Sequence, residues 1–195
     1  MADTGAPHFI PFADPTDLVR DWPALSEDVA DAVAAGLTAA GNAGIGSNVV
    51  SVAKTDTFSM SSATFADVTG LSATITPTSE TSRMLVIVSM NVGSTISTHS
   101  ALVRLRRDST NLFIGDAEGS RNRASSSATE NANSSNSLGV VFLDSPSVAT
   151  PVEYKIQLAS SDGDRLVTVN RTVNDTNAVT TPRLASSITV IEVAP

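Results

Sequence analysis

The segment Phe65–Val92 constrains the fold more than any other part of the sequence. Between Leu71 and Thr76, apolar and polar residues alternate, and a period of two places them on opposite faces of a β-strand. Pro77 ends this strand, because proline lacks the N–H that a strand ladder requires. The run Met84–Val88 is then apolar without interruption, which predicts a strand covered on both faces. The segment therefore predicts two β layers, with a neighbouring subunit covering the outer face of the second strand.

Strand patterns recur through the rest of the chain after residue 48. Strands are predicted over 49–54, 57–61, 64–76, 83–92, 101–107, 111–115, 137–143, 152–159, 165–170 and 186–193. The clearest alternation runs from Val152 to Leu158, and no helical periodicity interrupts the region. Because strands do not alternate with helices, the sheets should be antiparallel. We predict a mainly-β protein, an antiparallel jelly-roll sandwich of roughly nine or ten strands.

The first 47 residues follow different rules. Pro7 and Pro11 flank an apolar run and keep it extended, whereas a helix is predicted from Pro23 to a stop at Gly41. Residues 42–47, which contain two glycines, form the best joint in the chain. We therefore predict two parts. Residues 1–47 are an N-terminal arm and helix, and residues 48–195 are a β-sandwich knob.

The arm carries more apolar anchors than a solvated tail requires. Its candidate partner-binding residues are large apolar side chains, namely Phe9, Ile10, Phe12, Trp22, Leu25, Val29 and Val33. Such side chains are costly to leave in water, which favours packing on other copies or on a larger assembly. The alternative is that the helix packs on its own β domain.

Charge and composition exclude several function classes. Residues 1–47 carry seven acids and one base, a net charge of −6, and the remainder carries thirteen acids and eleven bases, a net charge of −2. No basic stripe is present to neutralise a phosphate backbone, so nucleic-acid binding is disfavoured. With no cysteine and only two histidines, we expect no metal centre and no cofactor. The sequence has neither a long apolar run nor a signal-peptide pattern, so we expect a soluble protein without membrane insertion.

Two connections are longer than a compact sandwich needs. The segment Ser120–Asn136 contains no apolar residue larger than alanine, which predicts a surface loop outside the core. Its candidate receptor-binding residues are Arg121, Asn122, Arg123, Asn131 and Asn133. The second connection, Arg171–Ser186, has three apolar residues, Val173, Val179 and Leu184, as potential anchors.

Candidate catalytic and metal-binding patterns are few. Asp162-Gly163-Asp164 places two carboxylates on one turn, which suits either a hairpin or a calcium ion, and the hairpin is favoured. His99 has no sequence neighbour that marks it as a base, and no G-x-S-x-G elbow is present. Arg104, Arg106 and Arg107 suit a basic ligand patch or, as we favour, an outward charged face. We therefore predict that the protein is not an enzyme.

The N-terminal string HFIPFADPTDLVRDWPALSEDVADAVAAGL resembles the opening of minor tail and fibre proteins from tailed phages of high-GC Gram-positive bacteria. The β segments FADVTGLSATITP, SETSRMLVIVSMNV, VEYKIQLAS and ASSITVIEV are similar to the jelly-roll modules that follow such openings. These modules resemble C1q-like and tumour-necrosis-factor-like jelly rolls, which are commonly trimeric.

The resemblance implies a homotrimer whose arm docks on phage capsid or tail proteins and whose knob is exposed on the virion. Fibres of this kind often carry a collagen-like or coiled-coil stalk, which this chain lacks between arm and knob, so a short appendage is favoured over a long fibre. The alternative function is a receptor-binding module that recognises a host-surface glycan through the knob loops.

Overall fold

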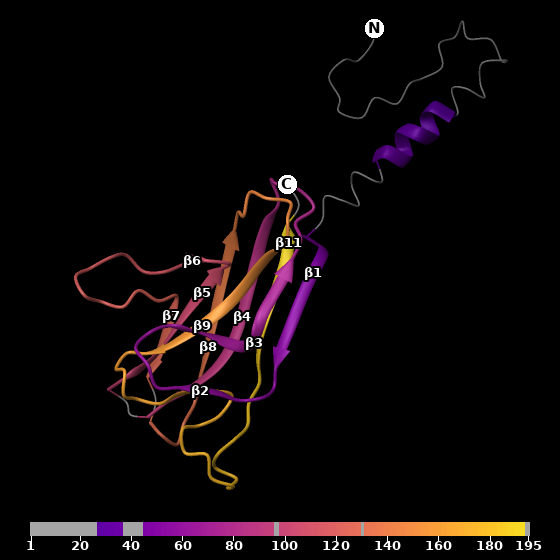
Figure 1. Cartoon of the computed structure of the whole chain (residues 1–195). Coiled ribbons are helices and arrows are strands. Elements are labelled where there is room, and N and C mark those ends of the chain that lie inside the picture. Colours follow the sequence, from indigo (N-terminus) through magenta and orange to yellow (C-terminus); the bar gives the residue numbers. More distant parts are fainter. Residues whose placement is uncertain (1–26, 37–44, 96–97, 130, 194–195) are drawn as a thin grey trace, which may run out of the picture. The chain divides into compact units, whose positions relative to one another are not determined.

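The computed structural model describes residues 27–36, 45–95, 98–129 and 131–193 (Figure 1). The chain divides into two compact units, Met1–Gly44 and Ile45–Pro195. In the first unit the described residues form a helix over 27–36, inside the helix predicted from Pro23 to Gly41. In the second unit β1 begins at Ile45, so the strand includes residues that we predicted as part of the joint.

The described residues of the second unit form eleven strands in two antiparallel sheets, which are stacked face to face (Figure 1). Sheet A contains β1 (Ile45–Lys54), β2 (Phe58–Met60), β4 (Arg83–Ser94), β8 (Asn136–Asp144), β10 (Val167–Val169) and β11 (Ser186–Val193). Sheet B contains β3 (Ala66–Ile75), β5 (Ser100–Arg107), β6 (Thr110–Leu112), β7 (Ser126–Thr129) and β9 (Val152–Ser160).

The connections between the sheets define a jelly roll. In sheet A, β4 pairs with β8 along one edge and with β11 and β10 along the other, and β11 pairs in turn with β1. In sheet B, β9 lies between β3 and β5, and β5 also pairs with β6 and β7. The chain passes from one sheet to the other at β3–β4–β5 and again at β7–β8–β9. This confirms the predicted mainly-β, antiparallel jelly-roll class.

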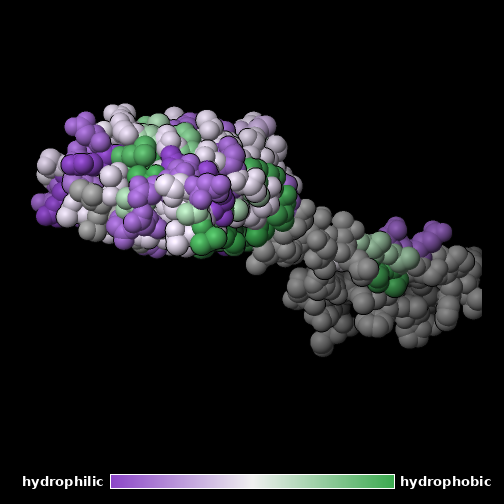
Figure 2. Space-filling view, turned by 90° about the horizontal axis from the view of Figure 1, so that it is seen from below, coloured by the Kyte–Doolittle hydropathy of each residue, from purple (hydrophilic) through white to green (hydrophobic). Residues whose placement is uncertain are grey.

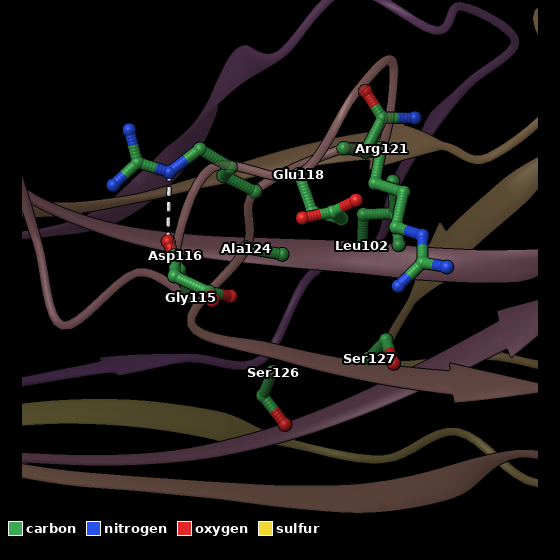
Figure 3. Close-up of a pocket in the computed structure, with 10 residues that line it drawn as sticks. Leu102, Gly115, Asp116, Glu118, Arg121, Ala124, Ser126 and Ser127 are labelled. Atoms are coloured by element: carbon green, nitrogen blue, oxygen red, sulfur yellow. Dashed lines mark hydrogen bonds between the residues drawn. The ribbon is translucent and has the colours of Figure 1, made fainter.

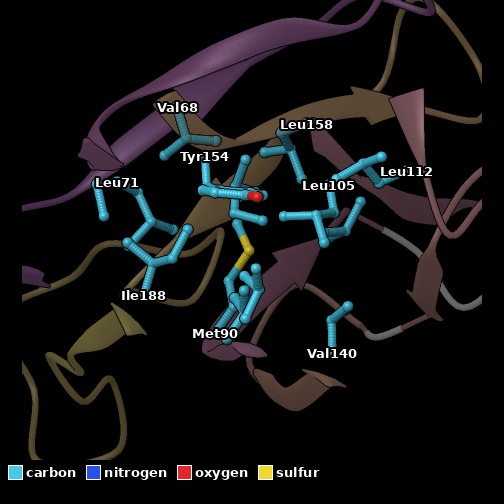
Figure 4. Close-up of a cluster of buried hydrophobic side chains, with 14 of the residues drawn as sticks. Val68, Leu71, Met90, Leu105, Leu112, Val140, Tyr154, Leu158 and Ile188 are labelled. Atoms are coloured by element: carbon cyan, nitrogen blue, oxygen red, sulfur yellow. The ribbon is translucent and has the colours of Figure 1, made fainter. Parts of the chain in front are cut away.

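The core lies between the sheets and follows the alternation of the strands (Figure 4). Each inward position of β4 is buried from Met84 to Val92, and the inward positions of β9 and β11 face them. Leu71, Leu105 and Ile188 are fully buried in the same cluster. Burial of these side chains is the main stabilising contribution to the fold.

Two buried carboxylates tie the layers together. Asp144 of β8 accepts hydrogen bonds at Oδ2 from the Tyr154 hydroxyl, at 2.6 Å, and from Arg107 Nη1, at 2.5 Å. Because Tyr154 and Arg107 belong to sheet B, this group links the two sheets. Glu192 of β11 accepts bonds from Thr78 and Asn48, and so fixes the β3–β4 turn to the end of sheet A.

The prediction that Ser120–Asn136 lies wholly outside the core was wrong. Residues Ser126–Thr129 form β7, which pairs with Ser100–Val103 of β5. Ala128 is 6% exposed and belongs to the hydrophobic core cluster. An alanine is small enough to fill the space beside β8, so the absence of larger apolar residues did not exclude a core strand.

The prediction that β4 is covered on both faces does not hold within one chain. Its inward residues Met84, Val86 and Val88 are buried, but Ile87 on the outer face is 37% exposed. Leu85, also on the outer face, is only half-buried. The uninterrupted apolar run therefore places hydrophobic side chains on the outside of sheet A.

Candidate functional site

Rows of paired residues cross the outer face of sheet A from β1 to β8. The first row is apolar throughout and consists of Val49, Ile191, Leu85 and Leu143. The second row is half apolar and consists of Ser51, Thr189, Ile87 and Val141. The third row has small side chains and consists of Ala53, Ser187, Ser89 and Gly139. No side chain in these three rows is ionisable, so this surface has no charge to keep it hydrated.

We call the six large apolar residues of these rows the apolar face: Val49, Leu85, Ile87, Val141, Leu143 and Ile191. Four of them are strongly exposed, with Val141 at 61%, Val49 at 49%, Leu143 at 41% and Ile87 at 37%. On the side of the β unit that Figure 2 shows, hydrophobic residues gather mostly in a band along one margin. Contiguous exposed apolar surface of this kind marks interaction sites more often than isolated exposed residues do.

The outer face of sheet B is charged instead. Lys155 Nζ lies 2.8 Å from Asp67 Oδ2, and Gln157 Nε2 donates to Asp67 Oδ1 at 2.7 Å. The bond from Lys155 lowers the pKa of Asp67, and the same contact raises the pKa of Lys155. Arg104 lies over the ring of Phe65, 3.6 Å from its centroid. The two outer faces of the sandwich therefore differ sharply in polarity.

Arg104 and Arg106 lie on the outer face of sheet B, as predicted. The alternating residues Val103 and Leu105 point inward and are buried. Arg107 points the other way, because its guanidinium binds Asp144. The three arginines therefore do not form one basic patch, which excludes that alternative.

A hollow of about 290 Å³ lies over β5 beneath the loop that joins β6 to β7 (Figure 3). We call it the loop pocket; its lining residues are Leu102, Gly115, Asp116, Glu118, Arg121, Asn122, Arg123, Ala124, Ser126 and Ser127. Figure 3 shows Glu118 and Arg121 on the same side of the hollow as Leu102, with Ser126 and Ser127 on the other side. Leu102 is only 8% exposed although it is on the outer face of its strand, because the loop covers it.

Hydrogen bonds to backbone oxygens hold the base of this loop, residues 113–125. Gly115 N donates to Ala124 O at 3.3 Å, and Arg123 Nε donates to Gly115 O at 2.7 Å, the bond drawn in Figure 3. Arg104 Nη2 in turn donates to Arg123 O at 2.7 Å. At the start of the loop Phe113 has a φ of 50°, and its ring lies 5.4 Å from that of Phe142. A bulky residue seldom adopts such a φ, so the ring contact helps to hold a strained start.

The structure brings together part of the predicted receptor site. Arg121, Asn122 and Arg123 all line the loop pocket. Asn131 and Asn133 do not line it; the Asn133 amide N–H donates to Asn131 Oδ1 at 2.9 Å in a separate turn. Sequence reasoning missed Asp116, Glu118 and Leu102, because all three precede Ser120, where the predicted loop begins. Only the folding of the loop over β5 shows that they share the pocket.

The predicted arm anchors fall mostly outside the described residues: Phe9, Ile10, Phe12, Trp22 and Leu25. Val29 and Val33 lie on the helix over 27–36, where Val29 is partly exposed and Val33 is 47% exposed. Of the predicted anchors, these two side chains lie in the described part of the first unit, and both are accessible to a partner.

The Asp162 turn has a neighbour, His99, that the sequence did not reveal. His99 Nε2 lies 2.9 Å from Asp162 Oδ2, and Thr98 Oγ1 lies 3.0 Å from His99 Nδ1. The pair joins the β4–β5 and β9–β10 connections, which are far apart in the sequence. Across the described residues, no three His, Cys, Asp or Glu side chains cluster closely enough to hold a metal ion. No helix among them is both long and apolar enough to cross a membrane.

Fold and surface together define the class of the second unit: a jelly-roll β-sandwich with a charged outer face on sheet B and an apolar patch on the outer face of sheet A. No protein family matches this sequence, and no curated protein matches it either. Among solved structures, the chain is similar to one described as "Structure of infectious bursal disease virus Gx strain", with 12% identity and a TM-score of 0.40. That match covers 75% of this chain and 36% of the viral chain.

Proposed function

We propose that this protein is a structural component of a phage virion, a short homotrimeric appendage that acts by assembly and display. Residues 1–47 anchor it to capsid or tail proteins, and residues 48–195 form the exposed jelly-roll knob. The resemblance of the arm to the openings of phage tail and fibre proteins supports a location on the virion. The observation that carries the proposal of self-association is the apolar face.

A second copy of the chain is the partner that suits this face best. Each copy has a net charge of −8, so a contact between copies is favoured only where it does not place like charges against each other. The three rows on sheet A carry no ionisable group, whereas the outer face of sheet B carries several. The face also reaches β8, which is an edge strand of sheet A. Among the described strands of this sheet, β8 pairs only with β4. Covering it with another copy removes both the exposed apolar side chains and the open strand edge.

The test is the mass of the full chain in solution. We expect sedimentation at micromolar concentration to give a trimer, and Val141→Asp to dissociate it, because an unpaired carboxylate in the contact is costly. The matched control is Thr74→Asp, an exposed position on the outer face of sheet B, which should leave the trimer intact. Circular dichroism checks that both variants fold. A stable 20.1 kDa monomer of the unaltered chain, or a trimer unaffected by Val141→Asp, would refute self-association through this face.

Anchoring to the particle needs a separate experiment. Electron microscopy of virions labelled with an antibody against the β unit should show the label at one kind of site on the capsid or tail. Trp22→Ala should reduce that label, whereas Thr74→Asp should not. Purified virions that carry no label, with the chain absent from their protein content, would overturn the virion proposal.

The second candidate function is recognition of a host-surface glycan. The observation that favours it is the convergence of Arg121, Asn122 and Arg123 on one hollow. If it holds, substitutions in the loop pocket will reduce adsorption of particles to cells without changing particle assembly. Unchanged adsorption would leave the knob as a decoration of the particle.

A further inference from the structure

The loop pocket contains several polar side chains that bind nothing within the protein. In the described part of the chain, no side-chain hydrogen bond or ion pair engages Asp116, Glu118, Arg121 or Asn122, although all four line the hollow. By contrast, Arg123 and Arg104 hold the base of the loop through backbone oxygens. The protein thus supports the loop with some charged groups and leaves others open towards the pocket.

The charges around the pocket balance. Its lining includes two acids, Asp116 and Glu118, and two bases, Arg121 and Arg123, so its net charge is zero. An anionic ligand would meet the two carboxylates, and a cationic ligand would meet the guanidinium of Arg121, while that of Arg123 is held at the loop base by its bond to Gly115 O. The lining therefore favours a neutral ligand that offers hydroxyl donors to carboxylates and oxygen acceptors to a guanidinium.

The size and lining of the pocket narrow the choice further. A hollow of about 290 Å³ is at the small end of ligand sites, which suits one ring and not an extended molecule. Leu102, which is 8% exposed, adds a small apolar surface beside Glu118 and Arg121, and Ser126 and Ser127 add two hydroxyl groups on the other side of the hollow. We propose that the loop pocket binds a single pyranose unit of a neutral saccharide, with Glu118 accepting from its hydroxyl groups and Arg121 donating to its oxygens.

The lining of the pocket predicts that each site binds a sugar weakly. None of its lining residues is aromatic, so a sugar ring has no stacking surface apart from Leu102. We expect a Kd in the millimolar range for one unit, and several copies on one appendage raise the effective affinity for a polysaccharide. This assignment rests on the second candidate function, the recognition of a host-surface glycan. Binding of a free glycoside is measured on the protein alone and is independent of the virion proposal.

The experiment is a titration of the full chain, labelled with ¹⁵N, followed by amide shifts in NMR spectra. The probes are methyl glycosides of glucose, galactose, mannose and N-acetylglucosamine, at up to about 50 mM, well above the expected Kd. We expect at least one to shift amides of residues 115–127 in a saturable way. Arg121→Ala should weaken that binding about tenfold, and Glu118→Gln about fivefold. Matched controls are Arg165→Ala and Glu80→Gln, which replace the same residue types outside the pocket.

The outcomes are distinct. If no glycoside shifts these amides, or if Arg121→Ala binds as tightly as the unaltered chain, the saccharide assignment is wrong. Binding of glucuronate or inorganic phosphate in preference to every methyl glycoside would overturn the neutral-ligand argument. If glycosides fail to bind while loop variants still lose adsorption to cells, the receptor function survives and only the ligand class fails.

Discussion

Glu192→Gln tests whether a buried carboxylate holds the end of the sandwich together. Glu192 is fully buried; its Oε1 accepts from Thr78 N at 2.7 Å and from Thr78 Oγ1 at 2.5 Å, and its Oε2 accepts from Asn48 Nδ2 at 2.9 Å. Burial alone would raise the pKa of this carboxyl, but the polar groups around it, Ser82, Thr78 and Asn48, lower it to about 2. Glutamine keeps the shape but places an N–H₂ group where one oxygen accepted bonds.

The shift sets the size and the pH window of the effect. The pKa falls from 4.5 in the unfolded chain to about 2 in the folded one, so the ionised form contributes about 3 kcal/mol at neutral pH. Because the folded pKa is the lower one, this stability is present above pH 4.5 and is lost as the pH falls through about 2. At pH 3 about 1.4 kcal/mol of it remains. The cost of Glu192→Gln should therefore shrink by about 2 kcal/mol between pH 7 and pH 3.

The assay is urea unfolding of both proteins at the two pH values, at one protomer concentration so that association does not alter the comparison. Glu80→Gln, at an exposed position of the same β3–β4 connection, is the control and should change stability little at either pH. A cost of Glu192→Gln that is the same at both pH values would refute the reasoning, because the carboxylate would then contribute no charge-dependent stability.

Two further substitutions test other parts of the core. Tyr154→Phe removes the 2.6 Å bond to the buried Asp144 carboxylate and should lower the free energy of unfolding by about 1–3 kcal/mol in urea titrations. An unchanged free energy of unfolding would contradict the inter-sheet role of this group. Gly93→Ala places a Cβ 2.7 Å from Thr168 Oγ1 and 3.0 Å from Arg171 O, so it should destabilise the fold by about 1–3 kcal/mol. Gly139→Ala, where the nearest atom would be 4.0 Å away, is its control, and equal effects of the two substitutions would argue against the close approach.

The strands were predictable because one face of almost every strand is buried. Alternation in Leu71–Ile75 and Val152–Leu158 records the core face directly, and both segments form strands with that face inside. β7 escaped prediction because Ser126, Ser127 and Thr129 surround one small buried residue, Ala128. Such a strand depends on its pairing with β5, and no periodicity in its own sequence indicates that pairing.

The candidate site was predictable only where one segment supplies it. Arg121, Asn122 and Arg123 stood out as polar and charged residues in a loop without apolar anchors, and they do line the pocket. Leu102 did not stand out, because an outward leucine on a strand looks like any other surface residue until a loop covers it. The partner of His99 was missed for the same reason, since Asp162 becomes its neighbour only when two connections meet in space.

The apolar face by itself is too small to hold copies of the chain together. Four of its side chains are 37–61% exposed. Burying the exposed part of each side chain contributes about 1 kcal/mol, which gives on the order of 4–5 kcal/mol in all. Association costs an estimated 4–15 kcal/mol in lost translational and rotational freedom, which consumes most or all of that gain. A stable trimer therefore needs a second contact, which we expect the large apolar residues of the arm, such as Phe12 and Trp22, to supply in addition to anchoring. Assembly should then depend on both parts, so Trp22→Ala should weaken the trimer in sedimentation even though it leaves sheet A unchanged.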